Sequence, residues 1–496
     1  MTGNISKQKI TSEHFYRFFL CPHWIWYDLY EDQQKHKHVP PIMQLLYEGK
    51  IREGEKLFSH TKFEKLVPEL GQDLDEAFAV TLELMKQGKN IYRPVLMHEH
   101  WVGMPDLIEA RPISELNNKR GSNFGDYYYV AYDIRNDQEI KDEYKLPLVF
   151  SSLILENIQG VRPRDGYLVN ADGQAKSFLI EDSIETFKWS LKEIEKILNG
   201  EKPLPFLKSG CKRTPWYSIC LSDSRGCDDI SLVYRLSQAD QRRFYDLGIK
   251  TVDDFASRDF GELQELLRDW PIDKLLQFHN QAQVLKENKI RILKKPKFSE
   301  VNTEVYLDIE SDPTQVIDYL IGLLVKKGSG RPEYKCLFAH GKEEESKIWS
   351  QFLDFVKELD DDSVFYHYGY YEKYVINRLF HTYGGPIELV SKFKDRAIDL
   401  HRTTVDSVVL PLYFYSLKDV AGYFGFKWSS EGAGGAESVV WYDEWLKTKD
   451  EKLLKKLIQY NEDDVRATYA LKEWLTSLKP QKKRVKEKLD GNQNHP

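Results

Sequence analysis

The chain has 496 residues and a formal net charge of −7; hydrophobic residues make up 41% of it and charged residues 30%. This composition is typical of globular proteins and excludes a disordered chain. The negative net charge excludes a basic nucleic-acid coat protein but leaves a local basic groove open. No apolar run approaches the ~20 residues of a membrane span, and residues 1–8 lack the apolar core of a signal peptide. We therefore expect a cytoplasmic protein without a membrane segment, built from about two to four domains.

Residues 1–229 form the first predicted domain, in which hydrophobic periodicity indicates both helices and strands. Ser12 is the expected N-cap of its first helix and Asp182 that of its last. The pattern predicts helices over 12–31, 49–66, 145–157 and 182–199, strands of one sheet over 98–109 and 127–134, and a hairpin of 166–169 with 176–180 around 171–173.

Residues 230–292 predict short helices, interrupted by the sequence Leu-Gly-Ile-Lys-Thr at 247–251. A helix that stops at Gly248, followed by Thr251 as the cap of the next helix, is typical of a helix-hairpin-helix-like unit. A plain helical spacer is the open alternative. A lysine-rich linker then leads into the next domain.

The third predicted domain, 301–478, begins with a buried strand at 305–307 and a second strand at 319–325. Helices and strands alternate after it, which favours an α/β domain around a mixed sheet. The basic segment 479–496 is expected to be a disordered tail.

Three groups of residues in the third domain carry candidate chemistry. Asp308 and Glu310 follow a buried strand at i and i+2, so both carboxylates face one side and repel each other unless a cation lies between them. Tyr460 and Asp464 are i and i+4 on an inward helix face, where an Asp needs a partner such as a metal; a core tyrosine with a capping or solvated aspartate is the alternative. Glu372 opens a helix after a short strand. It could supply another carboxylate ligand at the sheet edge, or it could stand there because the helix dipole favours an acidic residue.

Together these groups resemble a DnaQ-like 3′–5′ exonuclease of the DEDD class, tyrosine variant, which implies a ribonuclease-H-like fold. The sequences Tyr-Ser-Leu-Lys-Asp-Val-Ala at 415–421 and Gly-Phe-Lys-Trp at 425–428 also resemble the ribonuclease-H-like domain that is fused to predicted RecB-family nucleases. The resemblance implies two-metal phosphodiester hydrolysis by Mg²⁺ or Mn²⁺, with Tyr460 orienting the attacking water. The implied metal ligands are Asp308, Glu310, Glu372 and Asp464. Glu372 departs from the usual aspartate and is a longer ligand, and Asp399 is expected to be structural.

The first domain resembles the PD-(D/E)xK core of RecB-like nucleases, with Gly-Met-Pro-Asp at 103–106 followed by a strand that ends at 133–135. The resemblance implies a restriction-endonuclease-like fold with Asp106, Asp133 and the upstream Glu53 as metal ligands. Arg135 stands where the family has a lysine, and arginine substitutes poorly for a lysine that positions water. A degenerate, nucleic-acid-binding scaffold is therefore favoured over an intact second nuclease site.

The chain has five cysteines, too few for a disulfide framework, and Cys336 is expected to be a core residue. The other four, Cys21, Cys211, Cys220 and Cys227, resemble the split set that closes an iron–sulfur staple in RecB-like nucleases, which implies a 4Fe–4S cluster. Thr214 stands where the family has its second cysteine, so Cys227 would have to replace it. A zinc site and unrelated buried thiols are the alternatives.

The resemblance extends over nearly the whole chain and predicts a metal-dependent nuclease, with the C-terminal domain as a 3′–5′ exonuclease acting on DNA. A ribonuclease or a nuclease for RNA–DNA hybrids is the second hypothesis, and a non-catalytic nucleic-acid-binding scaffold for a helicase is the third. Relatives of this architecture are often fused to superfamily 1-type helicases. Because the sequence has no Walker A motif, ATP-driven unwinding would have to come from such a partner.

Overall fold

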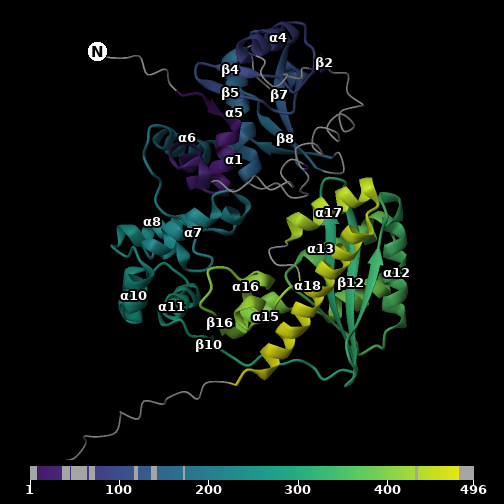
Figure 1. Cartoon of the computed structure of the whole chain (residues 1–496). Coiled ribbons are helices and arrows are strands. Elements are labelled where there is room, and N and C mark those ends of the chain that lie inside the picture. The colour runs from purple at the N-terminus through teal and green to yellow at the C-terminus, as the bar shows by residue number, and fades with distance from the viewer. Residues whose placement is uncertain are drawn as a thin grey trace, which may run out of the picture. The chain divides into compact units, whose positions relative to one another are not determined.

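The computed structural model describes residues 8–35, 45, 64–65, 73–116, 121–135, 142–170, 174–429 and 434–479 (Figure 1). They fold as two compact units. The first contains the residues up to Gln241 together with Asp312–Ile317, and the second contains Arg242–Ser311 and the residues from Asp318 onward. In the part of the chain that is described, no helix is both long enough and apolar enough to cross a membrane.

The first unit begins with two short helices in place of the single helix expected over 12–31: α1 (Ser12–Leu20) and α2 (His23–Tyr30). Cys21 between them is extended, with φ −154° and ψ 114°, because the ring of the following Pro22 disfavours helical geometry in the residue before it. Thr11, rather than Ser12, is the N-cap of α1, and its backbone N–H donates to His14 Nδ1 at 3.0 Å.

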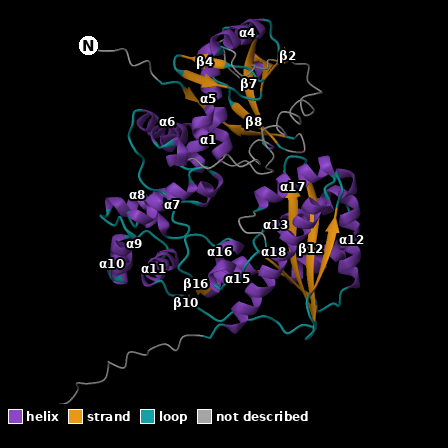
Figure 2. Ribbon diagram, viewed as in Figure 1, coloured by secondary structure: helices purple, strands orange, loops and turns teal. Residues whose placement is uncertain are grey.

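Two sheets form the β part of the first unit (Figure 2). A three-stranded sheet has the order β1 (Ile10–Thr11), β5 (Trp101–Gly103), β4 (Leu96–His98). A six-stranded sheet has the order β2 (Glu64–Lys65), β3 (Ile91–Tyr92), β6 (Leu107–Pro112), β7 (Tyr127–Ile134), β8 (Asp165–Val169), β9 (Ala175–Leu179). The single strand expected over 98–109 is therefore wrong, since its first part lies in the small sheet and only β6 pairs with β7. The predicted hairpin is confirmed as β8 and β9.

Helix α5 (Asp142–Gln159) packs against both sheets of this unit and confirms the helix expected around Pro147. Its Phe150 forms an aromatic core with Phe15 of α1 and Phe187 of α6 (Ile184–Leu198), with ring centroids 5.0–5.1 Å from Phe15. Asp182 is not the cap of α6, because it lies in the 3-10 turn Glu181–Ser183 before it. Helix α4 (Leu74–Lys86) and helix α7 (Tyr217–Gly226) complete this unit; of the helix expected over 49–66, only residues 64–65 are described, and they form β2.

Four short helices follow: α8 (Gln238–Asp246), α9 (Val252–Ser257), α10 (Phe260–Leu266) and α11 (Ile272–Glu287). The predicted stop and cap between α8 and α9 are confirmed. Gly248 has φ +74°, and the Thr251 hydroxyl accepts from Asp254 N at 2.9 Å. Strand β10 (Arg291–Ile292) then pairs with β16 (Val408–Val409).

A five-stranded sheet forms the centre of the second unit, in the order β13 (Glu333–Phe338), β12 (Ile317–Lys327), β11 (Thr303–Asp312), β14 (Val364–His367), β15 (Ala397–Asp399). Strands β11, β14 and β15 run parallel, and β12 runs antiparallel to β13. The mixed sheet predicted from the sequence is confirmed.

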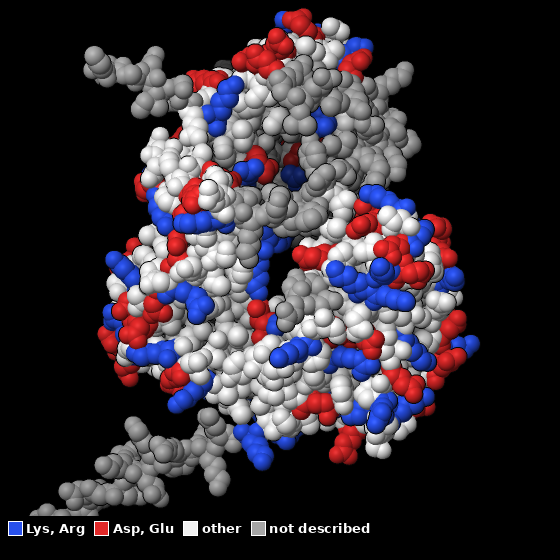
Figure 3. Space-filling view, in the orientation of Figure 1, with Lys and Arg blue, Asp and Glu red and all other residues white. Residues whose placement is uncertain are grey.

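Seven helices of the described chain surround or follow this sheet: α12 (Glu345–Glu358), α13 (Tyr371–Tyr383), α14 (Ile387–Arg396), α15 (Leu400–Ser407), α16 (Leu417–Tyr423), α17 (Gly435–Thr448) and α18 (Glu451–Ser477). The long α18 runs diagonally along the sheet in Figure 1. It packs closely enough that a Cβ at Gly322 of β12 would collide with the Asn461 amide oxygen, so this contact requires glycine. On the face of this unit seen in Figure 3, basic and acidic side chains are interspersed rather than gathered in a basic stripe.

Candidate metal centre

Strand β11 and helix α18 bring three of the predicted ligands together. Asp308 and Glu310 leave the same face of β11, and Asp464 projects from α18. The carboxylate oxygens of these three residues lie within 4.8 Å of one another. Glu310 and Asp464 are buried and Asp308 is half-buried, so the group forms a water-poor acidic cluster.

Each carboxylate of this cluster accepts a hydrogen bond from a neutral donor. Asn461 Nδ2 donates to Asp308 Oδ2 at 2.8 Å. Ser438 Oγ of α17 donates to Glu310 Oε2 at 2.9 Å. Trp428 Nε1 donates to Asp464 Oδ1 at 2.6 Å. These donors orient the carboxylates without cancelling their charge, which leaves a cation as the natural counter-charge.

Burial and mutual repulsion make ionisation of the cluster unfavourable. Burial first, and then the Asp464 charge, raise the pKa of Glu310 to about 7. Burial, together with the charges of Glu310, Asp464 and Glu372, raises the pKa of Asp308 well above its usual range. Burial also raises the pKa of Asp464. A divalent cation would reverse this penalty, because it favours the charged form of every carboxylate around it.

Tyr460 lies one helical turn before Asp464 and is 4% exposed. Burial and the three nearby carboxylates raise the pKa of its hydroxyl, which therefore stays protonated and able to donate a hydrogen bond. Lys418 Nζ lies 4.9 Å from the centre of the Tyr460 ring and 5.8 Å from that of Trp428. Lys418 therefore borders the cluster. It lies in the first turn of α16, where the Ser416 side chain caps the helix by accepting from Asp419 N.

Glu372 lies in the first turn of α13 as expected, but it is not among the carboxylates that converge within 4.8 Å, and its side chain contacts His367. Its Oε2 lies 3.4 Å from His367 Nδ1, and both side chains are buried. Within the described residues, neither ring nitrogen of His367 nor Oε2 of Glu372 has a hydrogen-bond partner. His367 is the last residue of β14, which runs parallel to β11. A histidine at this strand end was the one sequence signal that could have indicated its contact with Glu372. The sequence predicts no contact for Asn461, Ser438 or Trp428, although Trp428 ends the Gly-Phe-Lys-Trp motif at 425–428.

Asp399, which is expected to be structural, accepts hydrogen bonds at a helix start. Its Oδ1 caps α15 by accepting from His401 N at 2.8 Å, and it also accepts from Gly369 N at 2.9 Å. These bonds join the end of β15 to the start of α15 and to the turn at Gly369.

The acidic pair predicted in the first unit is also brought together. Asp106 N donates to Asp133 Oδ1 at 3.1 Å, and Ile134 N donates to Asp106 Oδ2 at 2.7 Å. The Arg135 guanidinium forms an ion pair with Asp133 Oδ2 at 2.8 Å. A permanent cation thus already neutralises one of these carboxylates. The predicted third ligand, Glu53, lies outside the described residues.

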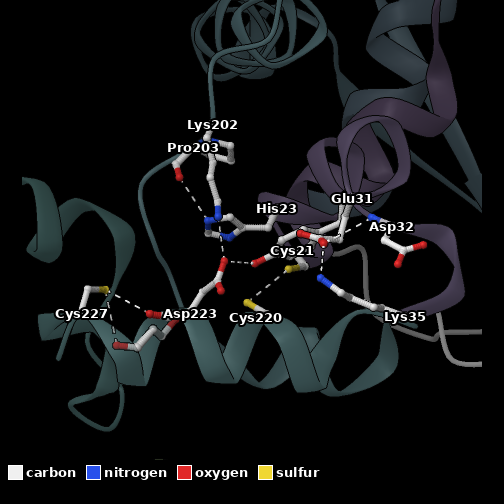
Figure 4. Close-up of polar contacts among 12 residues, drawn as sticks. Cys21, His23, Glu31, Asp32, Lys35, Lys202, Pro203, Cys220, Asp223 and Cys227 are labelled. Atoms are coloured by element: carbon white, nitrogen blue, oxygen red, sulfur yellow. Dashed lines mark hydrogen bonds and ion pairs between the residues drawn. The ribbon is translucent and has the colours of Figure 1, made fainter.

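Three of the four predicted cluster cysteines meet inside the first unit. Cys220 Sγ lies 3.9 Å from Cys21 Sγ and 3.8 Å from Cys211 Sγ. Cys227 does not join them: it is exposed, and its thiol donates to Asp223 O at 3.2 Å (Figure 4). Cys336, expected in the core, is half-buried on β13.

Residues 305–476 match the sequence model of the RNase H superfamily. This part of the chain is a ribonuclease-H-like domain. The matched segment contains the acidic cluster, Tyr460 and Glu372, and it supports a nuclease-type activity that depends on divalent metal ions. A search of curated proteins gives no match to the chain.

Proposed function

We propose that the ribonuclease-H-like domain is a 3′–5′ exonuclease that hydrolyses DNA with two divalent metal ions. The observation that carries this proposal is the cluster of Asp308, Glu310 and Asp464 with the protonated Tyr460 beside it. The order of these residues along the chain, with Glu372 between them, is that of the tyrosine-variant DEDD exonucleases.

The residues fit such metal ions. Carboxylate oxygens are the ligands that Mg²⁺ and Mn²⁺ prefer, and three of them converge within 4.8 Å. Glu372 is the proposed fourth ligand. Its buried Oε2, without a hydrogen-bond partner in the described chain, is costly unless it binds something, which supports this role.

Bound ions of this kind supply an activated water and charge stabilisation at the leaving oxygen. The chain's own contribution is positional. Asn461, Ser438 and Trp428 hold the carboxylates, and the Tyr460 hydroxyl donates to and orients the attacking water. Tyr370, which is 77% exposed and lies two residues before Glu372, is a candidate surface on which a terminal base stacks.

We propose the first unit as a degenerate RecB-like, restriction-endonuclease-like scaffold for nucleic acid rather than a second nuclease. The ion pair between Arg135 and Asp133 supports this, because the guanidinium neutralises the Asp133 carboxylate that would otherwise bind a metal ion. For the helix-hairpin-helix-like connector, Lys250 is the proposed phosphate contact: it is exposed, whereas Ile249 beside it is buried. A superfamily 1-type helicase remains the proposed partner for unwinding duplex substrates.

A panel of end-labelled substrates tests the proposal. Single- and double-stranded DNA, RNA and RNA–DNA hybrids, each labelled at the 5′ end and each incubated with Mg²⁺, Mn²⁺ or EDTA, should show stepwise shortening of DNA from its 3′ end with metal only. Asp308→Asn should reduce this activity by at least about 100-fold. Glu462→Gln, on the same helix but paired with Arg466 away from the cluster, is the matched control and should retain it.

Other outcomes assign the other functions. Shortening of RNA or hybrids with intact DNA would make the protein a ribonuclease. Binding of nucleic acid without cleavage of any substrate under any metal condition would support the non-catalytic scaffold.

A further inference from the structure

A second group of metal-ligand side chains lies inside the first unit, far from the carboxylates in sequence. Cys21 follows α1, His23 is the first residue of α2, Cys211 lies in the 3-10 turn Ser209–Arg213, and Cys220 lies in α7. All four are at most 1% exposed. The ligand atoms of Cys21, His23 and Cys220 lie within 4.8 Å of one another, and Cys211 Sγ is 3.8 Å from Cys220 Sγ.

His23 is arranged as a metal-bound histidine is. One ring nitrogen, Nε2, lies 3.2 Å from the carbonyl oxygen of Pro203, as Figure 4 shows. The other, Nδ1, is buried and has no hydrogen-bond partner among the described residues. A metal-ligating histidine uses one nitrogen for the metal and donates the other N–H to a carbonyl or carboxylate. The buried Nδ1 therefore has no hydrogen-bond partner, on a ring whose ligand atom lies within 4.8 Å of the Cys21 and Cys220 thiols.

We propose that Cys21, His23, Cys211 and Cys220 bind a single tetrahedral zinc ion. With Zn–S bonds of about 2.3 Å and tetrahedral angles, two thiolates on one zinc lie about 3.8 Å apart. The two sulfur–sulfur distances here are 3.8 and 3.9 Å. In a 4Fe–4S cluster each thiolate binds a different iron, so the sulfurs have to lie further apart than they do here.

The neighbours of this group limit the ligand set to these four residues. Cys227, expected as the fourth thiolate, is exposed and donates to Asp223 O and Ser224 O. Thr214, at the position of the missing family cysteine, donates its hydroxyl to Cys211 O at 2.9 Å. The Asp223 carboxylate is already held by Tyr27 and Lys202, at 3.0 and 2.8 Å.

The backbone around the site is built for close approach. A Cβ at Gly210 would collide with the carbonyl oxygen of Leu20, so only glycine lets the segment before Cys211 approach the segment before Cys21. The ion would therefore join the N-terminal helices to a segment about 190 residues later, at the other end of the same unit. The free energy of metal binding would then add to the free energy of unfolding of this unit.

Elemental analysis of the full-length protein, purified without added metal or chelator, tests the site. We expect about one zinc per chain, with little iron and no acid-labile sulfide. Cys211→Ser and His23→Ala should each lose most of the zinc. Cys227→Ser is the matched control, since it removes a thiol of the same segment that lies outside the ligand set, and it should keep the full zinc content.

Cobalt substitution gives a second readout, which remains usable if Cys211→Ser or His23→Ala fails to fold, because it compares the wild type with a variant that keeps four ligands. The Co²⁺ protein should show intense thiolate-to-cobalt absorption, and His23→Cys should retain the ion and raise that absorption by about a third, as three thiolates become four. Iron with acid-labile sulfide that is lost in Cys227→Ser would overturn the proposal in favour of the four-cysteine cluster. A wild-type protein without bound metal, or His23→Ala and His23→Cys variants with unchanged zinc content and cobalt spectrum, would also overturn it.

Discussion

Asn461 Nδ2 lies 2.8 Å from Asp308 Oδ2, so a neutral amide on α18 holds the leading carboxylate of β11. The amide is itself oriented by Tyr334, whose hydroxyl donates to Asn461 Oδ1 at 2.9 Å. The helix that carries Tyr460 and Asp464 is thereby bonded to the strand that carries Asp308 and Glu310.

The first prediction concerns this amide. Asn461→Ala removes the donor to Asp308 and should weaken Mn²⁺ binding by about 10- to 100-fold, the range for losing a group that orients a metal ligand. Isothermal titration calorimetry measures it. Gln459→Ala is the control, because Gln459 lies on the same helix and bonds Asp463 instead. Equal Mn²⁺ affinity in Asn461→Ala and the wild type would contradict the role.

The second prediction is the pH dependence of stability without metal. Because the pKa of Glu310 is raised to about 7, against about 4.3 in an unfolded chain, the folded protein binds more protons than the unfolded one between these values. The free energy of unfolding in EDTA should therefore rise as the pH falls from 8 toward 5. Urea titrations at several pH values measure this slope.

Glu310→Gln should reduce that slope, since the glutamine cannot titrate while Asp308 and Asp464 still can. Saturating Mg²⁺ should reverse the slope, because metal binding favours the ionised form. A stability that falls over the same pH range in EDTA would show that burial and repulsion do not raise the pKa of Glu310.

The third prediction concerns Tyr460. Tyr460→Phe removes only the hydroxyl and keeps the ring in the core, so it should lower turnover by about 10- to 1000-fold with little change in KM. Steady-state kinetics on a 3′-terminal substrate measure both constants. Tyr442→Phe, a buried tyrosine of α17 whose hydroxyl donates to Ala339 O, controls for the loss of a buried hydroxyl. Full turnover in Tyr460→Phe would remove the residue from the reaction.

The fourth prediction separates the two units. Asp133→Asn keeps an oxygen for the N–H of Asp106 while it removes the charge paired with Arg135. Exonuclease activity should remain within about twofold of the wild type, because all four proposed metal ligands and Tyr460 lie in the ribonuclease-H-like domain. Thermal melting checks that the variant stays folded, since a half-buried arginine that loses its ion pair costs stability. Loss of all cleavage in a folded Asp133→Asn protein would assign the reaction to the first unit.

Much of the second unit could be predicted because its signals are local. A buried strand followed by acid-x-acid, and an inward i, i+4 pair on a long helix, place Asp308, Glu310 and Asp464 on facing elements whatever the details of packing. The direction of the Glu372 side chain could not be predicted in this way. It depends on His367, which becomes its neighbour only when β14 and α13 pack together.

The cysteine region shows the same limit. The resemblance to RecB-like nucleases implied Cys227 as the fourth ligand. The break before Pro22 instead makes His23 the first residue of a new helix, where its ring lies near the Cys21 and Cys220 thiols. Helical periodicity over 12–31 hides that break, because the apolar face continues on both sides of it.

A substitution at Gly322 offers a way to inactivate the metal centre while all of its carboxylates are kept. The position belongs to β12, which supplies no ligand, yet any side chain there occupies the place of the Asn461 amide. A Gly322→Ala protein would keep every carboxylate, and with them the electrostatic field that a nucleic acid encounters, while it displaces the group that aligns Asp308. Such a variant suits the trapping of an uncleaved substrate better than a carboxylate-to-amide substitution, which changes the charge of the surface that the substrate meets.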